Sequence, residues 1–453
     1  MPAQAVERDE TTRLQRLQGI LQSGTLKNAG RMLNALQPGE IAHLLEALPL
    51  AEREIVWGLI DDENDGEVLV HLTDDVRSDL ISKMDLSRLL SATESLDTDD
   101  LADLIQELPH TITREIIASL DLQHRSRLEA VLSYPEDTAG GLMNPDAITV
   151  RPEVTLDVVM RYLRRLKNQI PAHTDNLMVV NRIGKYLGVL PLTKLVTHDP
   201  DEIVAEVMSL DQGAIPATWD DGQVANRFEQ HDLISAPVVD DSGILLGRIT
   251  VDDVVDVIRE EGEHQFMGQA GLSEDEDMFA PVLISTQRRA LWLGLNLITA
   301  FLASWVIVLF EQTIEKVVAL AVLMPIVASM GGIAGSQTLT LTIRGLALGQ
   351  LSSSNARWLV LKELAVGALN SVIWAIVVAV IAGIWFDNGA IGLLIAAALT
   401  INLVFAALTG ALLPLALDRM GIDPALAGSV LLTTVTDIIG FLAFLGLATL
   451  YLL

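Results

Sequence analysis

Five long apolar stretches follow Arg289, and they constrain this chain more than any other feature of its sequence. Each has between 21 and 30 residues; the first four contain no charged side chain, and the last contains only Asp437. A helix of about 20 apolar residues crosses a bilayer, so each stretch is long enough to be a membrane span. Five such runs with short polar connections do not suit the alternative, which is a set of helices buried in one large soluble core. The stretches are residues 290–310, 317–343, 364–386, 388–417 and 425–453.

The charges divide the chain into two unlike parts. Residues 1–289 carry 25 basic and 52 acidic side chains, a net charge of −27, whereas residues 290–453 carry a net charge of −2. So acidic a surface excludes nucleic acid as a partner, because phosphate backbones need a basic surface, and it favours cations. The chain has no cysteine, which excludes disulfides, thiolate metal sites and cysteine catalysis. The first ten residues are polar, and we expect no signal peptide there.

The basic residues beside the spans predict the orientation of the chain. With residues 1–289 in the cytoplasm, the inner flanks hold six basic residues and the outer loops hold only Lys316. This asymmetry predicts a cytoplasmic N-terminus, and five spans then place the C-terminus outside a cell's inner (cytoplasmic) membrane. The six inner residues are Arg288, Arg289, Arg344, Arg357, Lys362 and Arg419.

Two spans contain polar or conformationally unusual residues. A carboxylate facing lipid is costly, so Asp437 in the fifth span should face a partner or a water-filled path. The second span contains Pro325 and the glycines Gly331, Gly332 and Gly335. These glycines favour either a helix break that exposes backbone carbonyls to a cavity or close helix packing through small residues. Beside Asp437, we interpret them as part of a permeation path.

The part before the spans contains two kinds of internal repeat. Residues 41–49 (IAHLLEALP) recur as residues 101–109 (LADLIQELP), and helical repeats of this kind stack into a small superhelix. Residues 142–195 and 207–254 each alternate short strands with amphipathic helices around a glycine turn. This second pair resembles a tandem pair of cystathionine-β-synthase (CBS) domains.

An acidic run connects the second CBS-like copy to the first span. Residues 252–277 hold ten acidic side chains and one basic side chain, Arg259. If residues 252–268 are helical, Asp253, Asp256 and Glu260 share one face and repel one another. The run is therefore either a solvated linker or a cation site.

The order of these parts resembles the MgtE-type magnesium transporter family over nearly the whole chain. The motifs are DTAGGLM at residues 137–143, DPAL at 423–426 and TTVTDIIG at 433–440. Two motifs depart from the family pattern. Residues 331–337 read GGIAGSQ where the family usually has GGNTGNQ, and His264 and Gln265 stand where the family often has further acids.

The resemblance implies a multidomain fold and a mechanism. We expect an N-terminal all-α superhelical domain (1–135), a tandem α/β CBS domain pair (136–200 and 201–257), an acidic linker or plug helix (252–277) and a five-helix transmembrane domain (286–453). The family is a homodimer whose ion path lies between subunits and is lined by the second and fifth spans. The expected path residues are Asp437, Thr433, Thr434, Gly331, Gly332, Gly335 and Gln337; the expected metal ligands are Asp437, Asp99, Asp103, Asp253, Asp256, Glu260 and Glu261.

We therefore predict a homodimeric Mg²⁺ transporter or channel gated by cytoplasmic Mg²⁺, with membrane lipid and a second copy as partners. No GxxxxGK[ST] motif is present, so the membrane potential, about 2.3 kcal/mol per charge per 100 mV, would drive the ion. ATP binding at the CBS pair stays open. The alternatives are the same architecture carrying Co²⁺ or Mn²⁺, and a membrane-anchored ion or nucleotide sensor that conducts nothing. An enzyme is the least supported class, because no nucleophile and base are grouped.

Overall fold

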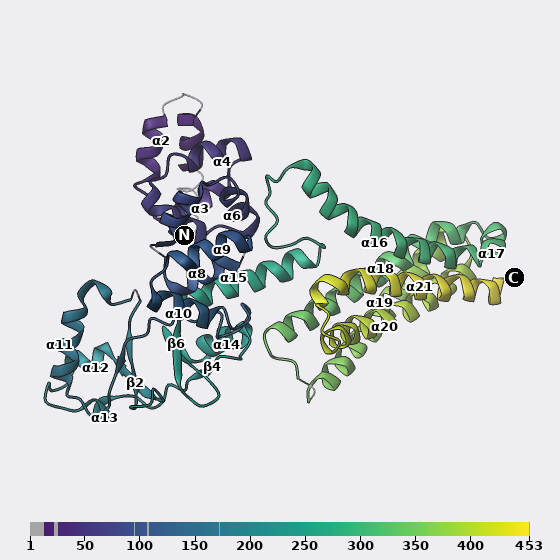
Figure 1. Cartoon of the computed structure of the whole chain (residues 1–453). Helices are drawn as coiled ribbons and strands as arrows, with labels where there is room; N and C mark the ends of the chain where they lie inside the picture. Colours follow the sequence, from purple (N-terminus) through teal and green to yellow (C-terminus); the bar gives the residue numbers. More distant parts are fainter. Residues whose placement is uncertain are drawn as a thin grey trace. The chain divides into compact units, whose positions relative to one another are not determined.

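The computed structural model describes residues 13–21, 26–94, 96–106, 108–171, 173–352 and 354–452. The chain forms two compact units (Figure 1). Unit 1 extends to Arg259 and includes the short segment Asp275–Ala280, and unit 2 comprises Glu260–Glu274 and Pro281–Leu453. The polar segment at residues 1–10, where no signal peptide is expected, lies outside the described residues.

The first part of unit 1 is all-α, as the sequence predicts. The two copies of the repeated motif lie in α3 and α8, and they bury the same pattern of apolar positions: Ile41, Ala42, Leu44 and Leu45 in one, Leu101, Ala102, Leu104 and Ile105 in the other. The described helices are α2 (Leu26–Leu33), α3 (Pro38–Glu46), α4 (Leu50–Trp57), α5 (Asp65–Val70), α6 (Asp74–Ile81), α7 (Leu86–Glu94), α8 (Thr98–Gln106), α9 (His110–Ser119) and α10 (Leu122–Val131), with a 3₁₀ turn η1 at Asp62–Asn64.

The two α/β copies have the same sheet topology, which confirms the repeat. In each sheet the first strand pairs parallel to the second and the second pairs antiparallel to the third. Both sheets shift register at the same point, after Val179 in one and after Val238 in the other. The strands are β1 (Thr149–Val150), β2 (Asn176–Val180) and β3 (Tyr186–Pro191), then β4 (Ile215–Pro216), β5 (Ser235–Val239) and β6 (Leu245–Thr250). The helices are α11 (Leu156–Leu166), η2 (Lys167–Gln169), α12 (Leu192–Thr197), α13 (Val204–Val207) and α14 (Asp221–His231).

The segment before each copy packs on the other copy, which no repeat in the sequence reveals. Asn144 exchanges backbone hydrogen bonds of 2.7 and 2.9 Å with Arg248 of β6, and Ser209 exchanges bonds of 2.7 and 3.0 Å with Val189 of β3. Each copy has its expected glycine turn between its last two strands, at Gly184 (φ +84°) and at Gly243 (φ +79°). Gly188 and Gly247 lie inside strands, where a Cβ would come within 2.5 Å of the Ser209 carbonyl oxygen or 2.6 Å of the Asn144 carbonyl oxygen.

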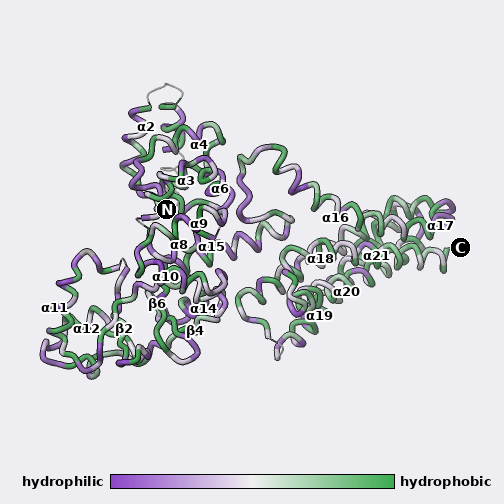
Figure 2. The backbone as a smooth tube through the Cα atoms, viewed as in Figure 1, coloured by the Kyte–Doolittle hydropathy of each residue, from purple (hydrophilic) through white to green (hydrophobic). Residues whose placement is uncertain are grey.

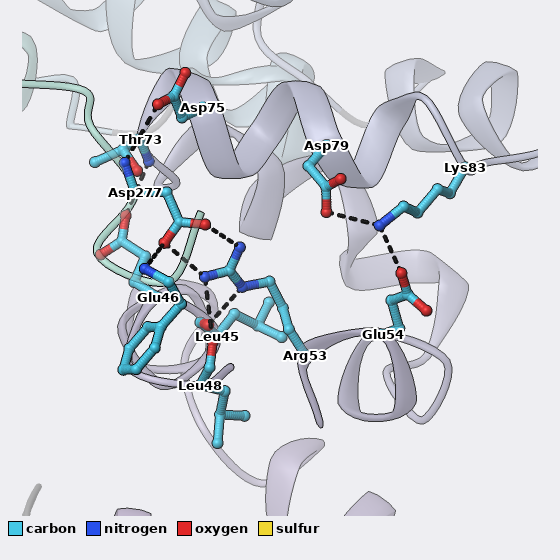
Figure 3. A network of polar contacts seen from close by, with 11 residues as sticks. Leu45, Glu46, Leu48, Arg53, Glu54, Thr73, Asp75, Asp79, Lys83 and Asp277 are labelled. Carbon is cyan, nitrogen blue, oxygen red and sulfur yellow. Dashed lines mark hydrogen bonds and ion pairs between the residues drawn. The ribbon is translucent and has the colours of Figure 1, made fainter. Parts of the chain in front are cut away.

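The acidic run forms a shorter helix than the expected 252–277. The linker helix α15 covers Val251–Gly268 and continues from unit 1 into unit 2. The chain then turns at Gly271, whose φ of +72° suits glycine. Residues 275–280 return to unit 1, where Asp277 pairs with the fully buried Arg53 through hydrogen bonds of 2.7 and 3.0 Å (Figure 3).

Among its described residues, unit 2 contains five helices long and apolar enough to cross a membrane (Figure 2). They are α16 (Val282–Val308), α18 (Ala319–Ala347), α19 (Ala356–Trp385), α20 (Gly389–Arg419) and α21 (Pro424–Leu452), with a short helix α17 (Glu311–Lys316) before α18. Helix α20 is the most buried of the five and packs against α18, α19 and α21. Of the two alternatives for the second span, the helix break does not occur, because α18 continues through Pro325 and all three glycines.

Candidate functional site

A groove lies between α18 and α21 in the membrane-spanning unit. Its volume is about 970 Å³ and it is broadly open in the single chain. We call it the α18–α21 groove; its lining residues are Ala328, Ser329, Gly332, Ile333, Ser336, Gln337, Thr340 and Leu341 of α18 and Thr433 and Asp437 of α21. Hydroxyl, amide and carboxylate oxygens in such a lining are the ligands that hydrated hard cations prefer.

Asp437 is the only charged side chain among these lining residues. It is half-buried, and no hydrogen bond or ion pair joins it to another residue that the structure describes. The neighbouring Thr433 and Thr436 hydroxyls donate instead to carbonyls of their own helix. A carboxylate at membrane depth without a partner is costly, so Asp437 needs a partner that none of the described residues supplies.

The sequence-predicted path residues do not all face the groove. Gly332, Gln337 and Thr433 line it together with Asp437. Gly331 and Gly335 pack instead against Asn402 and Leu432. Thr434 is outside the lining and donates to the Val430 carbonyl oxygen at 2.7 Å.

Unit 1 contains an acidic cluster where α8 meets the start of α15. Burial raises the pKa of Asp100 and Asp103 to about 7, and repulsion from neighbouring carboxylates adds to the shift. Burial and the adjacent Asp252 raise the pKa of Asp253 to about 6. The pKa of Asp99 is also raised, by burial and by Asp253, although Asn144 donates to Asp99 at 3.1 Å.

The cluster brings together only part of the predicted ligand set. Asp99, Asp103 and Asp253 belong to it, whereas Asp256, Glu260 and Glu261 are exposed further along α15. Across the described ranges, no three acidic or histidine side chains converge closely enough to hold a metal ion. The cluster is therefore a concentration of acidic side chains in the single chain, and its metal-binding role stays a prediction.

The structure also shows a contact between a histidine and two carboxylates that the sequence analysis did not predict. His264 near the end of α15 lies between two carboxylates, with Nδ1 3.0 Å from Glu274 and Nε2 3.0 Å from Asp423. Asp423 caps α21, since its side chain accepts from the backbone N–H groups of Ala425 and Leu426. The sequence signal was the histidine where resembling sequences have an acid, but its partners depend on the fold.

Burial lowers the pKa of His264, but the hydrogen bonds to Glu274 and Asp423 outweigh burial and raise it above the ordinary value of 6.5. Both ring nitrogens donate only in the protonated imidazolium, so protonation completes the contact on both sides. His264 therefore ties the end of α15 to the first turn of α21, the helix that carries Asp437.

Fold and groove together define a multi-pass membrane protein whose soluble part joins an all-α domain to a pair of α/β repeats. Family profiles match the same parts in the same order. Residues 36–137 match the MgtE intracellular N domain, residues 139–201 and 204–260 match the CBS domain, and residues 324–447 match the MgtE profile described as a divalent cation transporter.

Similar proteins cover almost the whole chain. The magnesium transporter MgtE of Thermus thermophilus is 32% identical over 444 residues, which is 96% of this chain and 98% of the relative. The magnesium transporter MgtE of Bacillus subtilis is 26% identical and covers 96% of both chains. A solved cytosolic domain of the Mg²⁺ channel MgtE in complex with ATP is 33% identical, covers 53% of this chain and 98% of that chain, and has a TM-score of 0.49. The chain belongs to the MgtE family.

Proposed function

We propose that this chain is a homodimeric transporter that moves Mg²⁺ across the cytoplasmic membrane through the α18–α21 groove. The observation that carries the proposal is Asp437, a carboxylate without a described partner in a groove at membrane depth whose lining also holds hydroxyl and amide side chains. The curated relatives that cover nearly the whole chain are named magnesium transporters, which supports Mg²⁺ as the cargo. Mg²⁺ sheds its water reluctantly, so Asp437 would hold the ion through its hydration shell.

A second copy of the chain would complete the path. The groove is open, and the apolar side chains of Ile333 and Leu341 in its lining are 56% and 51% exposed. Lipid would cover these apolar groups without penalty, but it would leave Asp437 unsolvated. A second groove facing the first would bring two Asp437 carboxylates to one water-filled path, with membrane lipid around the outside.

Cytoplasmic Mg²⁺ would close this path through the acidic residues of the soluble part. Without a cation, the carboxylates of α8 and α15 repel one another; bound Mg²⁺ would offset that repulsion and draw these elements together. The ligands would be Asp99, Asp103, Asp253, Asp256, Glu260 and Glu261. Residues 1–277 would then act as the sensor and residues 286–453 as the conducting part, with the N-terminus inside and the C-terminus outside.

Flux measurements in proteoliposomes test the proposal. The wild-type chain should carry Mg²⁺ into vesicles that contain a Mg²⁺-sensitive dye, driven by an inside-negative potential. Asp437→Asn keeps the shape of the side chain but removes its charge, and we expect flux to fall at least about 100-fold because the charge in the path attracts the cation. Competition by Co²⁺ and Mn²⁺ distinguishes Mg²⁺ transport from a path for another divalent ion.

Asp387→Asn is the matched control. Asp387 is an exposed carboxylate at the turn between α19 and α20, with a positive φ of 47° that asparagine also adopts. This variant should transport like wild type. Wild-type flux in Asp437→Asn would refute the assignment, and a wild-type chain that passes no divalent ion would favour the non-conducting sensor.

A further inference from the structure

Asn402 lies where the spanning helix α20 packs against both α18 and α21. It lies on α20, is fully buried, and donates through Nδ2 to the Val327 carbonyl oxygen of α18 at 2.8 Å. A Cβ on Gly331 of α18 would come within 2.2 Å of Nδ2, and a Cβ on Gly440 of α21 within 2.7 Å. Both glycines therefore make room for one amide side chain.

Burying the Asn402 amide at a helix crossing costs folding free energy. Its Oδ1 accepts no hydrogen bond from any residue that the structure describes. A buried acceptor without a partner weakens a fold, whereas an apolar side chain of similar size at the same position avoids that cost. Packing alone therefore does not account for Asn402, and the single bond to Val327 is its distinguishing contact.

Asn402 lies directly behind the α18–α21 groove. Val327 precedes the lining residues Ala328 and Ser329 on α18, and Gly440 follows Asp437 by one helical turn on α21. One side chain thus contacts both groove-lining helices at the level of the carboxylate. Shortening or lengthening it changes how closely these two helices approach each other there.

We propose that Asn402 is a positioning residue that fixes the spacing of α18 and α21 at the level of Asp437 and thereby sets which divalent cation passes. The inference rests on the proposed transport function. A groove held at one width admits an ion with a fixed number of waters, and Mg²⁺ keeps its waters more tightly than Ca²⁺ does. Altered spacing should therefore change the ratio of Mg²⁺ to Ca²⁺ flux and not only the total flux.

The first test removes the hydrogen bond from Asn402 to Val327 but keeps the number of side-chain heavy atoms unchanged. Asn402→Leu should lower the Mg²⁺ to Ca²⁺ flux ratio in proteoliposomes by about tenfold, the change expected when one buried hydrogen bond that distinguishes two states is lost. Asn370→Leu, the same change at an exposed position of α19, should leave the ratio at the wild-type value. An unchanged ratio in Asn402→Leu would overturn the proposal.

The second test uses the close approach of Gly331 to the Asn402 side chain. In Gly331→Ala the new methyl group collides with Asn402, so Mg²⁺ flux should fall at least about tenfold as the helices separate. Gly331→Ala combined with Asn402→Ala removes the colliding atoms, and flux should return to that of Asn402→Ala alone. A double variant that is no better than Gly331→Ala would overturn the proposal. Gly294→Ala is the matched glycine control, because a Cβ there meets no atom within 4 Å.

A third readout does not depend on transport. The chain has no native cysteine, so Ser336→Cys places a single thiol in the groove. A positively charged methanethiosulfonate should react with it at a rate that Asn402→Leu changes by about threefold or more and Asn370→Leu does not, because access controls thiol reactivity. If the chain passes no divalent ion but this rate changes, the transport function fails while the positioning role stands. If transport is present and the rate is unchanged, the positioning role fails.

Discussion

At the scale of single residues, burial decides how much an ion pair contributes to stability. Arg53 and Lys83 both form ion pairs with aspartates in unit 1 (Figure 3). Arg53 has no exposed surface and also donates to the carbonyl oxygens of Leu45 and Leu48, whereas the Lys83 side chain is 40% exposed. A buried pair that loses one partner leaves an uncompensated charge, but water replaces the partner of an exposed one.

Arg53→Met should therefore be far more damaging than Lys83→Met. We expect the free energy of opening of α4, measured by hydrogen exchange on the full chain, to fall by about 3–5 kcal/mol in Arg53→Met. Lys83→Met should change it by less than about 1 kcal/mol. Adding Asp277→Asn to Arg53→Met should recover part of the loss, because it removes the stranded charge. Equal effects of the two single substitutions would contradict this account.

At the scale of elements, His264 makes the docking of α15 on α21 depend on pH. Its pKa is raised above 6.5 in the folded chain, so the contact is fully stabilising below about pH 6.5 and is lost as pH rises through the folded-state value. The other charged groups beside it are Glu274 and Asp423, with Glu260 and Glu261 one turn earlier on its own helix. All four are acidic and favour the imidazolium.

We therefore expect the last two turns of α15 to be better protected from hydrogen exchange at pH 6 than at pH 8.5, after correction for intrinsic exchange rates. His264→Gln keeps a hydrogen-bonding side chain that does not titrate, and it should abolish the difference. His43→Gln, at a side chain 66% exposed in unit 1, is the control and should preserve it. Identical pH dependence in His264→Gln and wild type would exclude the contact as its cause.

At the scale of the whole molecule, the net charge of −27 on residues 1–289 makes this part of the chain sensitive to protons and divalent cations. The pKa values of Asp100 and Asp103 are raised from 3.8 to about 7 and that of Asp253 to about 6. A raised carboxyl pKa stabilises the packed state only while the group is protonated. This contribution is complete below about pH 3.8 and is lost as pH rises through about 6 to 7.

Without divalent cations, α8 and the first turn of α15 should therefore be less protected from hydrogen exchange at pH 8 than at pH 5 in the full chain, after correction for intrinsic exchange rates. Adding Mg²⁺ at about 10 mM, a concentration chosen for weak carboxylate sites, should restore protection at pH 8. Asp100→Asn should reduce the pH effect, whereas Asp232→Asn, at an exposed carboxylate with φ of 50°, should not. No response to Mg²⁺ at pH 8 would leave the cluster as a solvated acidic surface and remove the gating proposal.

The sequence by itself determined the properties that depend on local length and period. The five apolar runs are long enough to span a bilayer whatever their neighbours are, so five spanning helices could be predicted. The repeated order of strands and helices likewise predicted two matching α/β copies, because alternation and turns are local signals. The internal helical repeat predicted repeated helices, and the structure shows that the two copies, α3 and α8, bury equivalent apolar positions.

Only the tertiary structure decided which face of each element meets which neighbour. Gly331 and Gly332 are adjacent in sequence, yet Gly331 packs on Asn402 and Gly332 lines the groove, because consecutive helical residues point about 100° apart. Three contacts join residues far apart in sequence. The segment before each α/β copy packs on the other copy, Arg53 pairs with Asp277, and His264 contacts Asp423. Their partners depend on how the chain folds back, and no local pattern of residue types specifies that.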